Sequence, residues 1–473
     1  MPAHRKAIVM PAFCAVDTSE KEKGNKMKTI QKFTIEHALY PAMERFRGNQ
    51  IRVKTEHLRT SERLSAEQLR EMQSRKLAAL LKHCAEHVPA YHALGWDVQE
   101  IQRDPFAFLT SIPVLPKAAF QAAPENYLSD DANPAMLIPN RTGGSTGEPV
   151  HFYMTRGQVE AYEAARWRGL SWFGITPGSR CVMIWGNPIE LTQNAQRKYQ
   201  LRERMLKNRI IVSAYQLSSE TVPAKAVAIE RYRPEYLYGY SSALTLFAEM
   251  MLKAGVSLKL QLKAVVSTAE TLTEAQKKTL EAAFHCPIAN EYGARDAGTL
   301  AYSCPEGHLH ITAENSLIEV LDPVTHTPLP VGRTGVLAVT DLGNFAQPRL
   351  RYLLGDVGSL TAERCKCGRT LPLLGALEGR EDAMLVGADG QLVHGNAIGQ
   401  LIRRYDGVRQ FRFIQHTPEH ATLLLAPVSL GSAPSMQIVS EVQSLFPDAE
   451  IQIKIVESIL TMNKRCFFIV IGA

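Results

Sequence analysis

The sequence predicts an α/β protein in two parts: a large N-terminal domain of mixed sheets and helices that includes a β-rich subdomain, and a small, mobile α+β C-terminal domain. Between Cys181 and residue 284, β-like runs alternate with helical runs, which is typical of α/β layers with a largely parallel or mixed sheet. After Ser316 the pattern changes to short strands separated by turns, and the residues from 380 onward have a compact α+β pattern of their own.

The expected segments are an N-terminal leader with a helical extension (1–64), the large domain (65–379) and the small C-terminal domain (380–473). A helix is predicted from Ser65 to about Glu86, because apolar residues recur at helical spacing and Ser65 with Gln68 forms a capping-box pattern. Residues 375–380 are the best candidate for the linker between the two domains.

The other predicted elements follow in chain order. In the α/β part we expect strands at 181–186, 234–240 and 262–268, with helices at 224–232, at 242–254 and after a cap formed by Thr273 and Gln276. In the β-rich part we expect strands at 316–322, 335–342, 351–356 and 358–364. In the C-terminal domain we expect strands at 410–417, 421–428, 450–456 and 465–471, with a helix at 435–445.

The charge of the chain is mild for its 473 residues. The formal net charge is +6, and much of the excess lies in the first 54 residues. We interpret this as a solvated basic edge or a weak preference for anionic small molecules, and not as nucleic-acid binding. Pro11 interrupts the only stretch that resembles a signal peptide, so Met27 is a candidate initiator. No segment approaches the roughly 18 apolar residues of a membrane span, and we expect a cytoplasmic protein.

A glycine-rich segment, RTGGSTGEPV, extends from Arg141 to Val150. It is not a Walker phosphate loop, because Gly147 is followed by Glu-Pro and not by Lys-Ser/Thr, and because both flanks predict strands. Two interpretations remain: a plain flexible hairpin, or a turn whose backbone N–H groups and hydroxyls hold phosphate oxygens. The hydroxyls in question belong to Thr142, Ser145 and Thr146.

The same segment resembles the phosphate loop of the adenylate-forming superfamily, which comprises acyl-CoA synthetases, adenylation domains and luciferases. The form TGGSTGEPV is similar to the phenylacetate–CoA ligase and capsule-biosynthesis (CapK-like) branch, and further motifs of the family follow in the family's order. The resemblance implies that ATP phosphates contact Thr142, Gly143, Gly144, Ser145, Thr146 and Gly147.

Two further motifs imply other residues of the nucleotide site. STAETLT would set Ala269 and Glu270 beside the nucleotide. NEYGARDAG resembles the Tyr-Gly-x-x-Glu stretch of the family, which would put Tyr292 against adenine, with Glu291 and Gly293 beside it. In the same stretch, Asp296 would be the metal-associated carboxylate, although the family has Glu there.

Three motifs nearer the C-terminus complete the series. RYLLGD resembles the Tyr-x-x-Gly-Asp strand, which implies that Asp356 accepts hydrogen bonds from the ribose. EGREDAML resembles the family's linker motif, with Arg380 near ribose or phosphate and Asp382 at the hinge. ILTMNKRCFFIV would supply Lys464 as the mobile catalytic lysine, with Asn463 where the family has Gly.

The resemblance therefore implies a ligase that uses ATP and Mg²⁺ to convert a small carboxylic acid to an acyl-adenylate, with release of pyrophosphate. The acid is already ionised at pH 7, since its pKa is about 4–5, so the attack needs no general base. Lys464 and Arg380 would stabilise the developing charge. In a second step, after rotation of the C-terminal domain about Asp382, a thiol, usually of coenzyme A, would accept the acyl group.

Alternatives remain for the acceptor and for catalysis itself. A carrier-protein thiol, or a sugar or amine in polysaccharide or secondary metabolism, would change only the acceptor. A non-catalytic nucleotide-binding scaffold is the alternative from another class, because Asp296 and Asn463 both depart from the family pattern. The acid itself would contact Trp185, Tyr238, Tyr240 and Ser241, which lie where the family builds its acyl pocket, although aromatic residues at strand ends are as often core.

The chain has eight cysteines, which do not form a disulfide framework. CPEGHLH and CKCG together suit a closed tetrahedral zinc site with a structural role, and similar clusters occur in this branch of the family. The favoured ligands are Cys304, His310, Cys365 and Cys367, with His308 as the other candidate. Reduced surface cysteines are the alternative. The isolated histidines His83, His87, His151 and His285 are expected to have structural roles.

Overall fold

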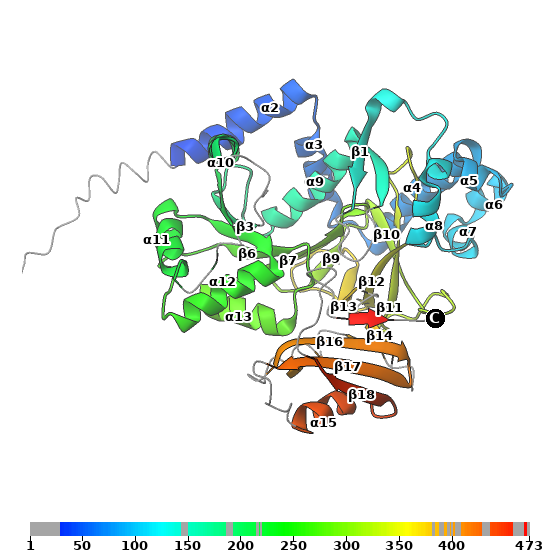
Figure 1. Cartoon of the computed structure of the whole chain (residues 1–473). Helices are drawn as coiled ribbons and strands as arrows, with labels where there is room; N and C mark the ends of the chain where they lie inside the picture. The colour runs from blue at the N-terminus through cyan, green and yellow to red at the C-terminus, as the bar shows by residue number, and fades with distance from the viewer. Residues whose placement is uncertain are drawn as a thin grey trace, which may run out of the picture.

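The computed structural model describes residues 29–142, 150–185, 193–213, 217 and 220–380, and in the C-terminal part residues 384–386, 392–394, 398, 401–402, 408–427, 436–456 and 468–470. Helices precede the first strand (Figure 1). They are η1 (Ile35–Leu39), α2 (Tyr40–Arg47), α3 (Ile51–Ser61), α4 (Ala66–His87), α5 (Pro89–His92), α6 (Val98–Arg103), α7 (Pro105–Ser111), α8 (Lys117–Ala122), η2 (Pro124–Tyr127) and η3 (Pro134–Met136). None of the helices in these ranges is long and apolar enough to cross a membrane.

Helix α4 begins with the predicted capping box. Ser65 Oγ accepts a hydrogen bond from the Gln68 N–H at 3.1 Å, and Gln68 Oε1 accepts one from the Ser65 N–H at 2.9 Å. Leu77, on the buried face of the helix, belongs to a hydrophobic core with Leu342 and Leu350. The helical region is therefore docked on the segment that leads into strand β12.

Strands β1 (Leu137–Arg141) and β2 (His151–Thr155) form an antiparallel hairpin. Arg141 pairs with His151, so the glycine-rich segment connects two paired strands, which confirms the flanks predicted from the sequence. Phe152 and Met154 alternate with exposed residues and are buried in the core beneath the hairpin.

The large domain is built on an 11-stranded sheet with the order β10-β11-β12-β13-β9-β8-β7-β6-β5-β3-β4. Its parallel half, shown in green in Figure 1, confirms the predicted alternation of strands and helices. The elements are α9 (Arg156–Ser171), β3 (Cys181–Trp185), α10 (Gln193–Lys207), β4 (Arg209–Ser213), α11 (Val222–Tyr232), β5 (Tyr236–Tyr240), α12 (Ser241–Lys253), β6 (Ala264–Thr268), α13 (Glu274–Phe284) and β7 (Ile288–Ala294).

Both faces of this parallel half are covered. Helices α11, α12 and α13 pack on one face, where Val265 of β6 joins their core. The end of α9 packs on the other face, where Ala264 and Val266 meet Leu170. Every residue of β6 is buried, as expected for a parallel strand between two layers of helices.

The β-rich part continues the same sheet in antiparallel fashion. Its strands are β8 (Gly298–Ser303), β9 (Leu309–Ile311), β10 (Ser316–Leu321), β11 (Gly335–Asp341), β12 (Tyr352–Thr361) and β13 (Leu373–Arg380). Within this part, a short ladder joins β9 to β13, in which Leu373 pairs with His310 and Leu374 with Leu309. The two strands predicted at 351–356 and 358–364 are the single strand β12, which has register shifts around Gly358.

The prediction of a linker at residues 375–380 is wrong, because these residues belong to β13 and pair with β12. The glycines that suggested a flexible connection serve close packing instead. A Cβ on Gly375 would come within 2.7 Å of Ser359 Oγ, and Gly379 has a φ of +114°. The connection to the C-terminal part therefore begins after Arg380, at residues that the structure does not describe.

The C-terminal part has the predicted α+β pattern. A four-stranded sheet with the order β18-β17-β16-β19 packs against α15, below the large domain in Figure 1. Its elements are β16 (Val408–Thr417), β17 (His420–Pro427), α15 (Met436–Leu445), β18 (Glu450–Ile455) and β19 (Phe468–Val470), and a hairpin of β14 (Met384–Val386) and β15 (Leu392–His394) precedes them. Phe413 and Phe446 stack in its core, with ring centroids 5.3 Å apart.

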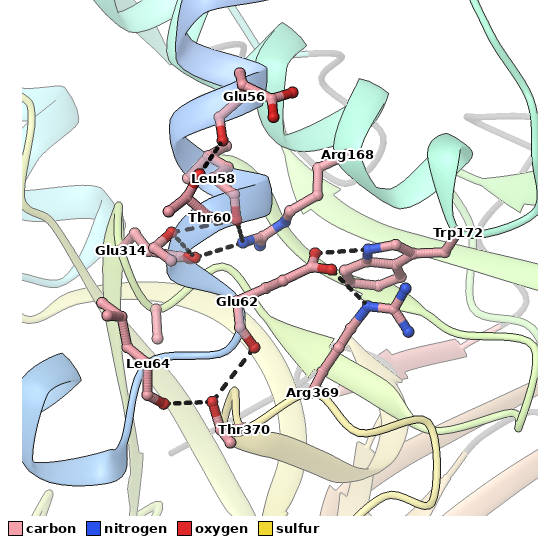
Figure 2. A network of polar contacts seen from close by, with 12 residues as sticks. Glu56, Leu58, Thr60, Glu62, Leu64, Arg168, Trp172, Glu314, Arg369 and Thr370 are labelled. Atoms are coloured by element: carbon pink, nitrogen blue, oxygen red, sulfur yellow. Dashed lines mark hydrogen bonds and ion pairs between the residues drawn. The ribbon is translucent and has the colours of Figure 1, made fainter.

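A polar network at the end of α3 joins the N-terminal helices to the large domain (Figure 2). Glu62 accepts a hydrogen bond from Trp172 Nε1 at 2.8 Å and forms an ion pair with Arg369 at 3.3 Å. Its carbonyl oxygen accepts a hydrogen bond from the Thr370 N–H at 3.1 Å. Arg369 also lies over the Trp172 ring, 4.4 Å from its centroid. Local sequence patterns do not predict this network, because its members lie up to 308 positions apart.

An almost completely buried ion pair lies beside Glu62. Arg168 and Glu314 are 2.5 Å apart, and their side chains are 1% and 3% exposed. Glu314 also accepts a hydrogen bond from Ser61 at 2.7 Å, and Arg168 donates one to the Leu58 carbonyl. The end of α3 is thus held to α9 and to the turn before β10 by hydrogen-bonded charges, which is the arrangement that makes a buried ion pair tolerable.

Candidate active site

Two predicted nucleotide-binding residues meet across the large domain. Tyr292, in β7, donates a hydrogen bond to Asp356 Oδ2, in β12, at 2.9 Å. These strands are not neighbours in the sheet, so the tertiary fold and not a strand ladder makes the contact. Gly293 follows Tyr292 at a place where no side chain fits, because a Cβ would lie 2.3 Å from Gly298 O.

Asp296 lies in the turn between β7 and β8 and is 6% exposed. Its Oδ2 accepts a hydrogen bond from Tyr352, in β12, at 3.0 Å. Its carbonyl oxygen accepts one from Arg349 at 2.7 Å. We did not predict a role for Arg349. It is 4% exposed and lies against the rings of Phe120, Phe152 and Tyr352. Its partners come from separate segments, so no local pattern marks it.

The predicted Ala269 and Glu270 form the turn after β6. Ala269 has a φ of +64°, a left-handed conformation that costs energy for a residue other than glycine. Glu270 Oε2 accepts a hydrogen bond from the Ser242 N–H at 2.8 Å, so its carboxylate caps α12. Ser241 is fully buried, and its hydroxyl contacts Ser267 Oγ at 2.5 Å and the Glu270 carbonyl at 3.0 Å. Ser241 therefore supports this turn and is not among the residues that line the cavity beside it.

Glu291 is buried in the middle of β7, and three donors lie near one of its carboxylate oxygens. Its Oε1 lies 2.9 Å from the Tyr238 hydroxyl, 3.2 Å from the Thr268 hydroxyl and 3.4 Å from Arg166 Nε. Its Oε2 has no hydrogen-bond partner among the described residues. Burial and the charge of Glu291 raise the pKa of Tyr238 well above its usual value. The phenol is therefore neutral and donates to the carboxylate.

A cavity of about 500 Å³ lies beside Tyr238, between the N-terminal helices, α9 and one face of β3 and β5. Trp185 and Tyr238, two of the four predicted pocket residues, line it. Tyr240 is stacked on Trp185 with ring centroids 3.9 Å apart, but it is not among the residues that line the cavity. Apolar and aromatic lining with a few polar groups is typical of small-molecule sites. Met183, Leu170 and Trp167 also line the cavity.

The remaining predicted site residues are described only in part. Thr142 closes the base of the hairpin turn, since its N–H donates to the Val150 carbonyl and its hydroxyl accepts from the Val150 N–H, both at 3.0 Å. Arg380 pairs with Asp356 in the β12–β13 ladder, but its side chain is not described. Gly143, Gly144, Ser145, Thr146, Gly147, Asp382 and Lys464 lie outside the described residues.

The predicted metal ligands come together away from this site. One ligand atom from each of Cys304, His310, Cys365 and Cys367 lies within 4.8 Å of the others. Cys304 Sγ is 3.5 Å from Cys365 Sγ, and Cys367 Sγ is 3.3 Å from His310 Nε2. A tetrahedral zinc site with Zn–S bonds of about 2.3 Å has edges of roughly 3.5–3.8 Å, so the four donors fit the ion.

Charged neighbours shift the pKa values of two residues in the same cluster. Burial, together with the positive charges of Arg369 and Arg168, lowers the pKa of His310 to about 4, so the imidazole is neutral near pH 7. Burial alone would raise the pKa of Cys367, but hydrogen bonds from Arg369 lower it. Arg369 thus connects the cluster to Glu62 of the network in Figure 2.

Comparison with known proteins shows which proteins this chain is similar to. No family model matches the chain. A phenylacetate–coenzyme A ligase of Thermus thermophilus is 29% identical over 340 residues, which cover 69% of this chain and 73% of that protein. The chain is therefore similar to the phenylacetate–CoA ligase-like branch of the adenylate-forming superfamily. The Escherichia coli phenylacetate–coenzyme A ligase is 25% identical over 334 residues, and the CapK protein of Staphylococcus aureus is 28% identical over 232 residues, about half of each chain.

Solved structures confirm the fold. A 2-hydroxyisobutyryl-CoA ligase, crystallised in the postadenylation state with R3-HIB-AMP, superposes with a TM-score of 0.64 at 19% identity. The match covers 86% of this chain and 90% of that one. The adenylate-forming fold, with its large mixed domain and small C-terminal domain, thus extends over most of the chain.

Proposed function

We propose that the chain uses ATP to convert a carboxylic acid to an acyl-adenylate, releases pyrophosphate, and transfers the acyl group to the thiol of coenzyme A. The contact between Tyr292 and Asp356 carries this proposal, because it brings together the two residues expected to hold adenine and ribose. The similarity to phenylacetate–coenzyme A ligases supports the same reaction. Since ATP and coenzyme A are its co-substrates, the reaction would take place in the cytoplasm.

The residue roles follow from this arrangement. Tyr292 would lie against adenine, and Asp356 would accept hydrogen bonds from the ribose hydroxyls. The hairpin turn that Thr142 closes would hold the β- and γ-phosphates through backbone N–H groups. An oxygen of the ionised acid then bonds to the α-phosphorus, while the bond from that phosphorus to the bridging oxygen breaks and its electron pair leaves with pyrophosphate. Lys464 and Arg380 would stabilise the charge that develops.

Asp296 would hold Mg²⁺. One protein carboxylate together with substrate phosphates is a common ligand set for this ion, and Tyr352 fixes the Asp296 carboxylate in place. When bound, Mg²⁺ would neutralise part of the phosphate charge that repels the anionic acid. Asp is shorter than Glu, and its carboxylate would be positioned here by the hydrogen bond from Tyr352 of β12.

The apolar part of the acid would occupy the cavity beside Tyr238. Trp185, Trp167, Met183 and Leu170 offer it aromatic and aliphatic contact. The cavity volume of about 500 Å³ suits a small organic acid. Glu291 would act indirectly, because it holds the Tyr238 hydroxyl at 2.9 Å and so fixes the ring in the cavity wall.

The cysteine cluster would bind one structural Zn²⁺. Cys304, His310, Cys365 and Cys367 would fill all tetrahedral positions, which leaves none for catalysis. The ion would join β9 to the loop that connects β12 with β13.

Pyrophosphate exchange into ATP tests the adenylation step. With a panel of carboxylic acids, wild-type protein should give acid-dependent exchange, and Asp356→Ala and Lys464→Ala should lose it. Glu56→Gln, on the exposed side of α3, is the control and should behave as wild type. If no acid supports exchange and ATP binds wild type no better than Asp356→Ala, the catalytic proposal is wrong and a nucleotide-binding scaffold remains.

The acceptor is tested separately. With the acid identified, coenzyme A should yield a thioester and AMP in equal amounts. The similarity to CapK favours a second candidate, in which the adenylate passes to a carrier protein or to a sugar or amine acceptor. Acid-dependent exchange without thioester formation would select that second candidate.

A further inference from the structure

The last turns of α4 carry a histidine pair that the proposed reaction does not use. His83 and His87 are four residues apart and therefore share one face of the helix, with ring centroids 5.0 Å apart. Asp131 approaches this pair from the segment after η2. One ligand atom from each of the three residues lies within 4.8 Å of the others. Among the described residues, this is the second group with such geometry besides the cysteine cluster.

The segment that carries Asp131 is fixed to the helix by its backbone. The Asp130 N–H donates to the His87 carbonyl at 2.9 Å, and the Ser129 N–H donates to the Ala346 carbonyl at 2.9 Å. The Ser129 hydroxyl donates to Asp131 Oδ1 at 2.7 Å. Both sides of the group are therefore held in place before any ligand binds, which reduces the entropy cost of binding.

Neighbouring polar atoms orient the imidazoles. His87 Nδ1 lies 2.9 Å from Asp130 Oδ1, and a carboxylate that contacts one ring nitrogen of a metal-bound histidine is the usual supporting arrangement. His83 Nε2 lies 2.9 Å from the Phe345 carbonyl oxygen and 3.1 Å from Ser129 Oγ. When no metal is bound, both oxygens accept a hydrogen bond from the Nε2–H of His83. A cation bound at this position would have the same oxygens as possible ligands.

We propose that His83, His87 and Asp131 form a second metal site, which binds a divalent transition metal ion such as Zn²⁺. Two imidazoles suit Zn²⁺, Ni²⁺ or Co²⁺ better than Mg²⁺ or Ca²⁺, and the carboxylate offsets the ion's charge. The side chains are 14%, 39% and 52% exposed, so the ion has a direct path from solvent. Three protein ligands leave coordination positions for water, and the ion is therefore exchangeable, in contrast to an ion held by the closed cysteine cluster.

The site connects two segments that lead to the candidate active site. Phe345 and Ala346 belong to the loop between β11 and β12, which also carries Gln347 and Arg349. Gln347 accepts a hydrogen bond from the Tyr153 N–H of β2 at 2.8 Å. A bound ion would hold α4 and the 129–131 segment together beside this loop, so binding should raise the thermal stability of the protein.

Metal titration of the full chain tests the proposal. Protein whose cysteine cluster is already filled is dialysed against a weak chelator and titrated with Zn²⁺. We expect wild type to bind one further equivalent of Zn²⁺. His87→Gln and Asp131→Asn should bind this equivalent at least 10-fold more weakly. His92→Gln, a nearby histidine outside the group, is the matched control and should bind as wild type. Equal stoichiometry and affinity in wild type, His87→Gln and Asp131→Asn would overturn the proposal.

Co²⁺ distinguishes the two sites by spectroscopy. A thiolate ligand gives an intense charge-transfer band, whereas a site of two histidines and an aspartate gives none. The further equivalent should therefore add no such band, and it should raise the melting temperature of wild type but not of Asp131→Asn. Asp131 is half-exposed, so its substitution leaves the folded protein available for the measurement. Growth of the thiolate band with this equivalent would show that the cysteine cluster was being filled and would refute the second site.

Discussion

The hydroxyl of Tyr292 donates a hydrogen bond of 2.9 Å to the carboxylate of Asp356, and this bond joins two strands that are not neighbours in the central sheet. It fixes the orientation of an acidic side chain relative to an aromatic ring. In the proposed function these groups hold the two halves of adenosine, so one hydrogen bond sets the distance between the base and ribose subsites.

Substitutions at Tyr292 and Asp356 should separate the effect of the Asp356 charge from the effect of its orientation by the Tyr292 hydroxyl. Asp356→Ala should lower kcat/KM for ATP in pyrophosphate exchange by about 100-fold, because hydrogen bonds to charged groups contribute about 1.5–3 kcal/mol. Tyr292→Phe keeps the ring and removes only the orienting hydroxyl, so we expect a loss of about 10-fold. Tyr199→Phe, on α10, is the control. If Asp356→Ala retained wild-type exchange, the ribose role would be wrong.

Changes in the cavity should affect the acid and not the nucleotide. Trp185→Ala removes a wall of the cavity and should raise the KM for the acid by about 10-fold, since burying an aromatic side chain against a ligand contributes about 1–2 kcal/mol. The KM for ATP should change by less than about twofold. Trp185→Phe retains most of the contact and should restore most of the affinity. Equal increases in both KM values would indicate a general loss of structure instead.

The cysteine cluster should hold one zinc ion per chain. Cys367→Ser should lower the zinc content measured by elemental analysis by one equivalent and the melting temperature by about 5 °C or more, because the ion's binding energy contributes to folding. Cys286→Ser, at a cysteine outside the cluster, should keep the metal. Wild-type protein purified without chelators and found to lack zinc would contradict the assignment.

Local patterns predicted the elements well. Ser65 with Gln68, and Thr273 with Gln276, form the capping boxes that the spacing indicated, since both partners lie within one helical turn. The flanks of the glycine-rich segment pair as a hairpin for a similar reason, because only a short connection separates them. Residue types, together with the resemblance to clusters in the family, predicted the cysteine cluster, and the structure brings its four residues together.

Long-range features could not be predicted in the same way. Glu62 contacts Arg369, more than 300 positions away, and nothing in the local sequence distinguishes it from an exposed glutamate. Glycine was misleading in β13, where Gly375 permits close strand packing and does not mark a linker. Ser241 follows an aromatic strand end, like a pocket residue, but the tertiary fold buries it under the turn at Glu270.

The Glu62 network should contribute measurably to stability. Glu62→Ala leaves Trp172 Nε1 and the largely buried Arg369 without their carboxylate, which should cost about 2–4 kcal/mol and lower the melting temperature by several degrees. Glu56→Ala is the matched control, because Glu56 is 68% exposed and forms a surface ion pair with Arg59 across one turn of α3. Its effect should stay within about 0.5 kcal/mol. Equal effects of the two substitutions would mean that the network contributes nothing specific.

An acid-sensitive contact lies at the other end of the N-terminal segment. Glu235, just before β5, is 2.6 Å from Lys32 Nζ and 2.8 Å from Lys263 Nζ. Burial alone would raise the pKa of Glu235, but hydrogen bonds from Lys263 and Lys32 lower it to about 2. In the unfolded chain a glutamate titrates near pH 4.3, so between about pH 4.3 and 2 the unfolded state binds more protons than the folded state.

Stability from this contact is therefore complete above about pH 5 and is lost as the pH falls towards 2. Glu235→Gln cannot ionise, so above pH 5 the free energy of unfolding of wild type should exceed that of the variant by about 1–2 kcal/mol after allowance for partial exposure, and its melting temperature should be higher. The difference should shrink steadily when both proteins are melted at successively lower pH down to about 3. Glu56→Gln should show no such pH-dependent difference. A gap between wild type and Glu235→Gln that stayed constant from pH 6 to pH 3 would mean that the carboxylate is not stabilised by the two lysines, because an ion pair must weaken as its acid takes up a proton.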